Sequence, residues 1–274
     1  MTTILVTNGN ILSMIALADW IIRYGKHLKG IFITTKLPSQ HSNTLGIISM
    51  LLNSGIEYTY FKVWTNILFP AKLKLIGKPS SVVELIKYLK IDAEIVYTED
   101  INKPEMIEKA KSFQPEILLS FSATQRFKKE LIEIPSRIAI NAHYALLPKY
   151  AGLSPYFWYL CNREKECGVT LHQMVSQLDA GPIIEQKVIP IEGGTTVLFV
   201  LLKQMNSISS MLNNFYEGIT HENNSFPQDL SQRSYFKHPK KEDIARFKKL
   251  GLTFLSATDK KAALATINKK LYSE

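Results

Sequence analysis

The stretch that decides the fold is "RIAINAH", residues Arg137–His143, which reads as a buried strand ending on polar side chains. Asn141 and His143 stand two positions apart, so in an extended strand their side chains face the same way. The next residues, "YALLPKYAG", turn the chain away at a Leu-Leu-Pro. We therefore expect an amide and an imidazole to point together from the end of this strand into one shared space.

Short apolar runs alternate with helical patterns on the N-terminal side of this strand. Between the runs, apolar residues recur at helical spacing, and this alternation predicts an α/β fold: a Rossmann-like, mostly parallel sheet with helices on both faces. Ligands of such sheets bind beyond the carboxyl ends of the strands, where Asn141 and His143 stand. The runs that read as strands are residues 3–7, 29–35, 56–63, 93–98 and 116–122, and the helix before the third run is expected to stop at Gly55.

Two further strands follow, "GVTLHQM" and "PIIEQKVI", and the turn "SQLDAG" between them presents Asp179. An Asp before a small residue and a glycine is by itself ordinary turn chemistry. Together with Asn141 and His143 it suits acyl transfer to an amine, which needs an oxyanion donor, a group that titrates near neutrality and a carboxylate to hold that group. The sequence has no Gly-x-Ser-x-Gly nucleophile elbow, so we expect the acyl donor to be already activated. It also has no Gly-x-Gly-x-x-Gly fingerprint, which argues against a dinucleotide-binding oxidoreductase.

Composition bounds the class of protein. The chain has 274 residues, 46% hydrophobic and 21% charged, which suits one large globular domain with a small appendage. Only Cys161 and Cys167 are cysteines, so neither a disulfide framework nor a metal site is expected. No signal peptide and no apolar run long enough to span a membrane is present, so we expect a cytoplasmic location and no membrane span.

The positive charge is concentrated near the C-terminus. The net charge is +9, and residues 237–274 hold ten Lys or Arg against four Asp or Glu, a local excess of +6. Such an excess can attract phosphates, as in tRNA or nucleotide sugars, although lysines that alternate with apolar residues are typical of solvated helix faces. A second lysine-rich segment, residues 58–81, is interpreted as an acceptor-side lid, a membrane-surface element or an insertion packed on the sheet edge.

A family resemblance rests on "INAHYALLPKYAGLSPYFWYL" and "GVTLHQMVSQLDAGPIIEQ". Their pattern of Asn-x-His, Leu-Leu-Pro, Gly-Val-Thr and Asp-x-Gly-x-Ile resembles the 10-formyltetrahydrofolate-dependent formyltransferases. This family includes glycinamide ribonucleotide, methionyl-tRNA and sugar N-formyltransferases. The resemblance implies the formyltransferase fold, with residues 1–205 as the catalytic domain and residues 206–274 as a C-terminal extension for dimerisation or acceptor binding.

The resemblance also implies roles for single residues. Asn141 matches the oxyanion-stabilising Asn, His143 matches the catalytic His, and Asp179 matches the catalytic Asp. His172 matches a histidine that, in several members of the family, contacts the catalytic residues and not the substrate. The cosubstrate would be 10-formyltetrahydrofolate, without a metal. The residues implied for its binding are Thr124, Gln125, Arg126, Phe127, Leu146, Leu147, Pro148, Gln177 and Leu178.

The acceptor amine is inferred by eliminating other branches of the family and by analogy with the sugar N-formyltransferases. We expect the amino group of a nucleotide-linked amino-deoxy sugar, of the kind used in lipopolysaccharide O-antigens. A methionyl-tRNA formyltransferase is the alternative suggested by "SYFKHPKKED", but only 35 residues follow Pro239, fewer than the β-barrel of that branch needs, and His172 favours the other branches. A formyltetrahydrofolate hydrolase would keep the same triad and stays open. A homodimer formed through Ser231–Phe247 is also expected.

Overall fold

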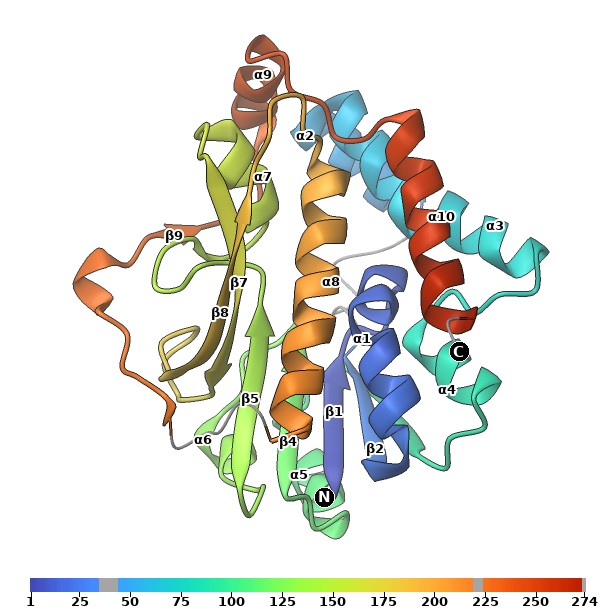
Figure 1. The fold of residues 1–274 in the computed structure, drawn as a ribbon, viewed down its shortest axis with the longest axis vertical. Helices are drawn as coiled ribbons and strands as arrows, with labels where there is room; N and C mark the ends of the chain where they lie inside the picture. The colour runs from blue at the N-terminus through green and yellow to red at the C-terminus, as the bar shows by residue number, and fades with distance from the viewer. Residues whose placement is uncertain (35–43, 219–223, 273–274) are drawn as a thin grey trace.

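A seven-stranded sheet forms the centre of the molecule in the computed structural model, which describes residues 1–34, 44–218 and 224–272 (Figure 1). The strand order is β3-β2-β1-β4-β5-β7-β8. The first five strands in this order are parallel to one another, and β7 and β8 form a hairpin that pairs antiparallel with β5. The predicted mostly parallel α/β fold is thus confirmed. The strands are β1 (Thr3–Thr7), β2 (Leu28–Thr34), β3 (Glu94–Thr98), β4 (Ile117–Phe121), β5 (Ile138–His143), β7 (Glu166–Gln173) and β8 (Ile183–Pro190).

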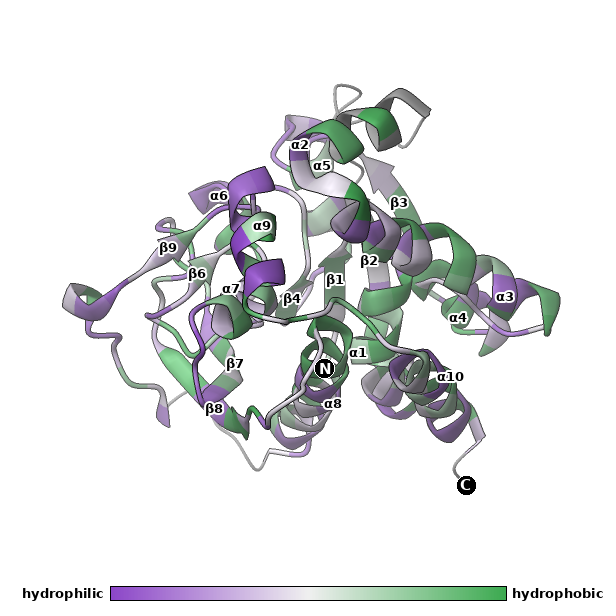
Figure 2. Cartoon of the chain, turned by 90° about the horizontal axis from the view of Figure 1, so that it is seen from above, coloured by the Kyte–Doolittle hydropathy of each residue, from purple (hydrophilic) through white to green (hydrophobic). Residues whose placement is uncertain are grey.

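Helices cover both faces of the sheet. Because strand side chains alternate in direction, Leu5 of β1 joins the larger hydrophobic cluster, while Ile4 and Val6 join the smaller one on the opposite face. Figure 2 shows the strands in the middle of the sheet as hydrophobic. The larger cluster is covered by α1 (Ile11–Tyr24), α4 (Val82–Tyr88), α8 (Val197–Tyr216) and α10 (Ala257–Tyr272), and the smaller by α5 (Pro104–Ser112) and α6 (Lys129–Ile132).

The run at residues 56–63, predicted as a strand, is helical, so that prediction was wrong. It forms the second half of α2 (Thr44–Val63) and continues through a π-helical turn, Trp64–Leu68, into α3 (Phe69–Leu75). Its aromatic and β-branched residues favour a strand locally, but Tyr58 and Phe61 recur at helical spacing and pack their rings on Phe254, at centroid distances of 5.7 and 5.6 Å. Tertiary packing therefore decided the helix.

The expected helix stop at Gly55 is a kink inside α2. Gly55 has φ 77°, a left-handed value that breaks the helix, and the chain resumes helical geometry after it. The lysine-rich segment thus consists mainly of helices. Together with α7 (Pro155–Cys161) and α9 (Lys241–Lys249), α2 lies at the end of the molecule toward which β5 points (Figure 1).

The C-terminal segment packs on the chain's own core. Strand β9 (Tyr235–Phe236) pairs with β6 (Ala151–Gly152), and Phe247 of α9 stacks on Phe157 of α7 at 4.9 Å between ring centroids. The buried Lys270 of α10 forms an ion pair of 2.5 Å with the partly exposed Asp19 of α1. Helix α8 continues across residue 205, where the catalytic domain was expected to end. The homodimer stays a prediction.

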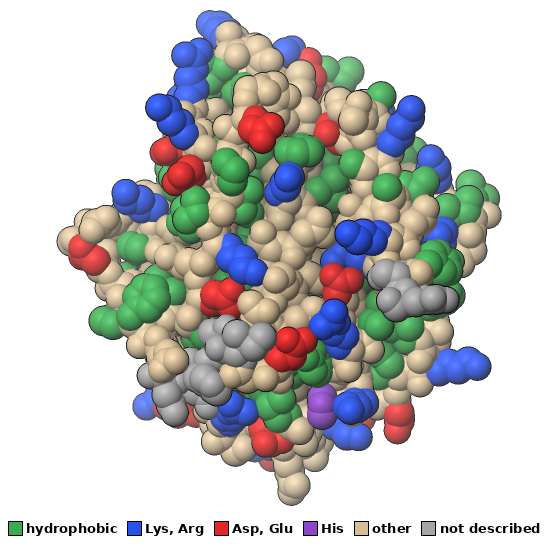
Figure 3. All heavy atoms as spheres, in the orientation of Figure 1, with side chains coloured by type: hydrophobic (Ala, Val, Ile, Leu, Met, Phe, Trp, Pro, Cys, Tyr) green, Lys and Arg blue, Asp and Glu red, His purple; other side chains and the backbone are tan. Residues whose placement is uncertain are grey.

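The surface carries its charges in scattered form. Figure 3 shows Lys and Arg side chains spread over the viewed face and interleaved with acidic and hydrophobic ones. Charged residues also form ion pairs, such as Lys248 with Glu57 at 2.5 Å and Arg23 with Glu217 at 2.9 Å. Within the three described ranges, no helix is both long and apolar enough to cross a membrane.

Candidate active site

Strand β5 places Asn141 and His143 at its carboxyl end, as predicted. In the pairing of β5 with β7, Asn141 lies opposite His172 and His143 lies opposite Thr170. The Asn141 amide nitrogen is 3.1 Å from Nε2 of His172. Antiparallel pairing of β5 with β7 therefore places His172 within hydrogen-bonding distance of the Asn141 amide, one of the groups that it was expected to contact.

The protonation state of His172 follows from its partners. Its Nδ1 is 2.7 Å from the carbonyl oxygen of Gln173, which can only accept, so Nδ1 carries the proton. Nε2 of the neutral ring then accepts from the Asn141 amide. Burial lowers the pKa of His172 to about 4, which keeps the ring neutral near pH 7. One N–H of Asn141 is thus held by His172, and its second N–H remains for another acceptor.

The turn between β7 and β8 delivers Asp179 to His143. Oδ1 of Asp179 lies 3.7 Å from Nδ1 of His143, and Oδ2 accepts from the backbone N–H of Gly152 at 3.2 Å. The Asp179 side chain is buried. The separation of 3.7 Å is too long for a direct hydrogen bond, yet it lets the carboxylate stabilise a positive charge on the imidazole.

The backbone of this turn is braced from two directions. A Cβ at Gly181 would stand 2.0 Å from the carbonyl oxygen of Gln173, so only glycine permits the turn to press this closely on β7. On the other side, Gln228 donates to the carbonyl oxygens of Asp179 and Gly181 at 3.1 and 2.7 Å. Arg233 donates to the carbonyl of the neighbouring Leu178. The C-terminal segment therefore holds the Asp179 turn in place.

The other ring nitrogen of His143 is unsatisfied. Nε2 is buried and has no hydrogen-bond partner within the described part of the chain. Buried polar atoms almost always have partners, and exceptions concentrate at functional sites. His143 thus has a carboxylate on its Nδ1 side and an unused acceptor or donor at Nε2, which is the arrangement that proton transfer to or from a substrate requires.

The turn after His143 is fixed by side chains from neighbouring elements. The Thr170 hydroxyl donates to the carbonyl of Ala145 and accepts from the N–H of Leu147. Gln186 of β8 donates to the Leu147 carbonyl at 2.8 Å, and Gln204 of α8 donates to the Tyr144 carbonyl at 2.8 Å. Sequence reasoning missed Gln186 and Gln204, and the available signal was the position of Gln186 at the end of the "PIIEQ" run.

The residues predicted to bind the folate lie in three segments near the end of β5. Residues 122–127 follow β4 and residues 144–148 follow β5, and because these strands are parallel neighbours the two segments emerge side by side. Residues 176–179 lie near these two segments, because Asp179 is 3.7 Å from His143 at the end of β5. The three segments therefore lie close to the end of β5, and their role in folate binding stays a prediction.

Individual side chains in these segments differ in their surroundings. Gln125 accepts from the Ile101 N–H at 2.7 Å and donates to the Glu99 carbonyl, so it ties its loop to the β3–α5 connection. Phe127 and Leu147 are buried among apolar side chains. The remaining predicted contacts are partly buried or exposed: Thr124, Arg126, Leu146, Pro148, Gln177 and Leu178.

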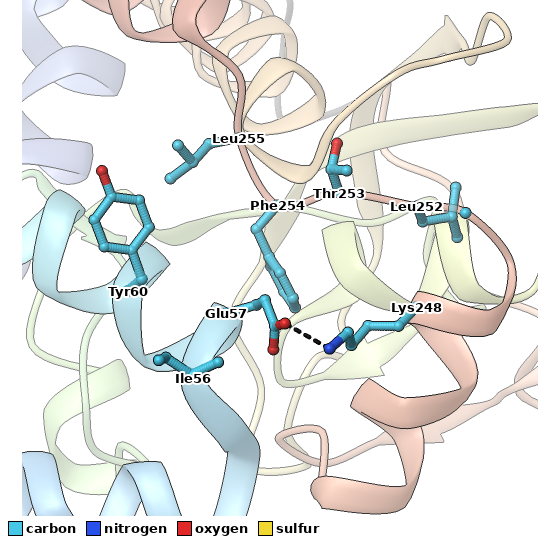
Figure 4. A pocket seen from close by; sticks show the side chains of 9 residues that line it. Ile56, Glu57, Tyr60, Lys248, Leu252, Thr253, Phe254 and Leu255 are labelled. Carbon is cyan, nitrogen blue, oxygen red and sulfur yellow. Dashed lines mark ion pairs between the residues drawn. The ribbon is translucent and has the colours of Figure 1, made fainter.

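A separate groove of about 590 Å³ lies between α2 and residues 248–255 (Figure 4). Its lining is mainly apolar, with Ile56, Leu252 and Phe254, and the Glu57–Lys248 ion pair lies at its edge. None of the three predicted catalytic residues lines it. Among the residues that the structure places, no group of three or more His, Cys, Asp or Glu side chains could hold a metal ion.

Solved structures share this fold. An N-formyltransferase from Helicobacter canadensis, solved with folinic acid and dTDP-3-aminofucose, is 17% identical over 87% of this chain and 71% of its own, with a TM-score of 0.56. A sugar N-formyltransferase from a Shewanella species is 16% identical over 97% of this chain and 87% of its own, with a TM-score of 0.53. Glycinamide ribonucleotide transformylase 1 from Symbiobacterium toebii is 16% identical over 84% and 95%, with a TM-score of 0.53.

The sequence itself carries the family relationship. The formyl transferase family matches residues 38–201, more than half of the chain. The matched range contains β5, the β7–β8 hairpin and all three predicted catalytic residues. With the α/β fold and the geometry at the end of β5, this match shows an enzyme that transfers formyl groups, and the chain belongs to the formyl transferase family.

Proposed function

We propose that this enzyme transfers the formyl group of 10-formyltetrahydrofolate to the amino group of a nucleotide-linked amino-deoxy sugar. The observation that carries the chemistry is the position of His143, between the Asp179 carboxylate and an unpartnered Nε2, two residues from Asn141 on the same strand. The pattern provides an oxyanion donor and a proton acceptor within one strand end.

When bound, 10-formyltetrahydrofolate supplies an activated formyl carbonyl, so the protein needs no nucleophile of its own. The free N–H of Asn141 donates to the carbonyl oxygen as negative charge grows there. His172 keeps this amide in the required orientation, because its Nε2 accepts the other N–H. An amide held in advance loses no free energy to reorientation at the moment of reaction.

His143 accepts the proton of the attacking amine, and Asp179 stabilises the charge that results. Nε2 of His143 is the atom with no partner among the described residues, so it can accept this proton, and a positive charge on the ring is stabilised by Asp179 on the Nδ1 side. When the bond between the formyl carbon and the folate nitrogen breaks, the same proton passes from His143 to the leaving nitrogen, so that tetrahydrofolate and the N-formyl product are released. The N–H of Gly152 and the neighbouring turn contacts keep the Asp179 carboxylate aimed at the ring. Residues 122–127, 144–148 and 176–179 would hold the folate around this centre.

The sugar acceptor is supported by likeness of fold. Two of the structural neighbours are described as sugar N-formyltransferases or bind dTDP-3-aminofucose, and these are properties of those proteins. Residues 234–243, which suggested the methionyl-tRNA alternative, pack on the chain's own core: β9 pairs with β6, and the indole N–H of Trp158 on α7 donates to the Lys237 carbonyl. A cytoplasmic location and a homodimer remain part of this proposal.

One assay separates the candidate functions. The purified chain is incubated with 10-formyltetrahydrofolate and, in parallel, with a dTDP-linked 4-amino or 3-amino sugar, glycinamide ribonucleotide, methionyl-tRNA or no acceptor, and tetrahydrofolate release is followed. We expect release only with an amino-sugar nucleotide, together with its N-formyl product by mass spectrometry. Release without acceptor would establish a hydrolase instead, and turnover restricted to methionyl-tRNA or the ribonucleotide would replace the sugar.

Donor binding is measured independently of the acceptor. Titration with 5-formyltetrahydrofolate, a stable donor analogue, is followed by calorimetry. Saturable binding without added metal is expected. An absence of binding at high micromolar concentration would remove the folate from the proposal.

A further inference from the structure

Lys62 occupies an unusual position on α2. Its side chain is partly buried and points at the aromatic cluster, with Nζ 5.3 Å from the ring centroid of Tyr58 and 5.8 Å from that of Phe61. The ammonium group also interacts with the hydroxyl of Tyr156 on α7. Within the described residues no carboxylate forms an ion pair with it.

A lysine in such surroundings is normally paired with a carboxylate. Burial by itself lowers the pKa of Lys62, but the hydroxyls of Tyr156 and Tyr58 more than offset this, and the pKa is raised. The group therefore stays charged at every physiological pH. Lys74 on α3 differs from Lys62, since it pairs with Glu84 at 3.0 Å.

The Lys62 cluster adjoins the catalytic residues by two routes. The Tyr156 ring packs edge-on against Tyr144, which follows His143 in the chain, at 6.4 Å between centroids. The Tyr156 hydroxyl also donates to Ser154 at 3.4 Å. Ser154 is two residues from Gly152, whose N–H donates to Asp179. The charge of Lys62, which has no acidic partner among the described residues, is thus linked to the site through Tyr156.

We propose that Lys62, with the hydroxyls of Tyr58 and Tyr156, forms an anion subsite that binds the diphosphate of a nucleotide-linked acceptor. This inference rests on the proposed sugar acceptor and names the residues that would select it. The lysine-rich segment would then bind the acceptor, while residues 122–127, 144–148 and 176–179 would bind the folate.

The chemistry of the three groups suits a diphosphate. Lys62 offers a compact charge with three N–H donors, and the Tyr58 hydroxyl on the same helix supplies a further donor. The Tyr156 hydroxyl on α7 can donate to the anion when it turns away from its long, 3.4 Å contact with Ser154. Phosphate oxygens accept strong, charge-assisted hydrogen bonds from such groups. Because Tyr58 is itself buried and Tyr156 partly so, the donors are held in place before the anion arrives.

The test uses the full chain with Lys62→Met, Lys62→Arg and a matched control, Lys72→Met. Lys72 is an exposed residue of α3, and its replacement also removes one positive charge. Calorimetry measures binding of dTDP, inorganic pyrophosphate, orthophosphate and ribose 5-phosphate at fixed ionic strength. Steady-state assays measure KM for the dTDP-amino sugar and for 10-formyltetrahydrofolate.

For Lys62→Met we expect dTDP and pyrophosphate binding to weaken by about tenfold to a hundredfold, the size expected for a lost hydrogen bond to a charged group. The sugar KM should rise in parallel, with the folate KM unchanged. Lys62→Arg should recover part of the loss, and Lys72→Met should match the wild type. Circular dichroism and thermal melts establish that each variant is folded.

Three outcomes overturn the subsite. Unchanged dTDP and pyrophosphate binding in Lys62→Met, with a lower melting temperature, would make Lys62 a packing residue. Equal losses in Lys72→Met would reduce the effect to net charge. Preference for orthophosphate or ribose 5-phosphate over pyrophosphate would refute the diphosphate. Pyrophosphate binding that depends on Lys62 without any formylation of amino sugars would instead uphold the subsite and refute the proposed acceptor.

Discussion

The two sides of the active site are built in different ways. The side that holds the three proposed catalytic residues, called the catalytic side, consists of β5 and the β7–β8 turn. Short polar groups form its hydrogen bonds, such as Asn141 to His172 and Gly152 to Asp179. On the α2 side, aromatic rings dominate, with Phe254 packed on Tyr58 and Phe61. Hydrogen bonds fix atoms in direction as well as in distance, whereas ring packing mainly fixes separation.

The contrast extends to the surface. The Asp179 and His172 side chains are buried, and the turn around them is braced by contacts from three parts of the chain. On the α2–α3 side, large apolar residues stand in solvent, with Leu75 87% exposed and Leu52 68% exposed. We infer that the catalytic side tolerates little displacement, while the α2 side can vary at its outer face without affecting the chemistry.

The largest expected effect comes from the catalytic side itself. Asn141→Ala removes an oxyanion donor and should lower kcat by about 10²–10³. His143→Ala and Asp179→Ala remove the proton acceptor or its support and should each lower kcat by about 10²–10⁴. The three losses should be far from additive, because the residues act as one unit.

The readout for these variants is tetrahydrofolate release, with 5-formyltetrahydrofolate binding and a thermal melt as controls. All three should fold and should bind the donor analogue. Near-normal turnover in His143→Ala or Asp179→Ala would reduce the motif to a strand end and a turn. It would also remove the contrast between the two sides.

The next largest effect tests the close packing of the Asp179 turn. In Gly181→Ala the new Cβ would meet the Gln173 carbonyl oxygen, so the turn must move away from β7 and carry Asp179 with it. We expect kcat to fall by about tenfold or more, since small displacements of catalytic groups are costly. The matched control is Gly193→Ala, where a Cβ would meet no atom within 4 Å. Equal activity of the two variants would show that the turn can shift freely.

A smaller effect is expected from pH. The folded-state pKa of His172 is about 4, below the usual value near 6.5, because burial disfavours the charged ring. The unfolded chain therefore binds this proton first as the pH falls. The stability from a neutral His172 is fully present above about pH 6.5 and is lost progressively toward pH 4, by roughly 1–3 kcal/mol.

Urea unfolding between pH 7 and about pH 4.5 measures this slope. In His172→Gln the slope should be shallower, because an amide does not titrate. Turnover at pH 7 should fall less in this variant than in Asn141→Ala, since His172 acts by holding the amide. If both proteins lose stability with the same pH dependence, burial of a neutral His172 contributes nothing measurable.

The smallest effect is predicted for the outer face of the insertion. Leu75→Ser replaces an exposed side chain at the end of α3 and should change the free energy of unfolding by less than about 0.5 kcal/mol. Turnover and donor binding should match the wild type. A clear loss of turnover would show that this face takes part in the reaction or in assembly, which would end the proposed difference between the two sides.

Sequence reasoning reached most of the catalytic side. The period of two along "RIAINAH" put Asn141 and His143 on one side of a strand, and the glycine turn put Asp179 between two strands. These are local properties, so a short stretch of chain contains the information. The same kind of reasoning failed at residues 56–63, where the local preference for a strand opposed a helical pattern of buried rings.

What the sequence determined by itself is therefore the α/β class and the positions of Asn141, His143 and Asp179 at a strand end and a turn, since these follow from short-range periodicity and turn chemistry. The catalytic roles of the three residues come from the family resemblance and stay predictions. The tertiary structure alone decided that His172 orients Asn141, that Gln228 and Arg233 brace the Asp179 turn, and that Lys62 meets Tyr156. These pairs are far apart in the chain. Their proximity depends on strand order, register and helix packing, which no local pattern encodes.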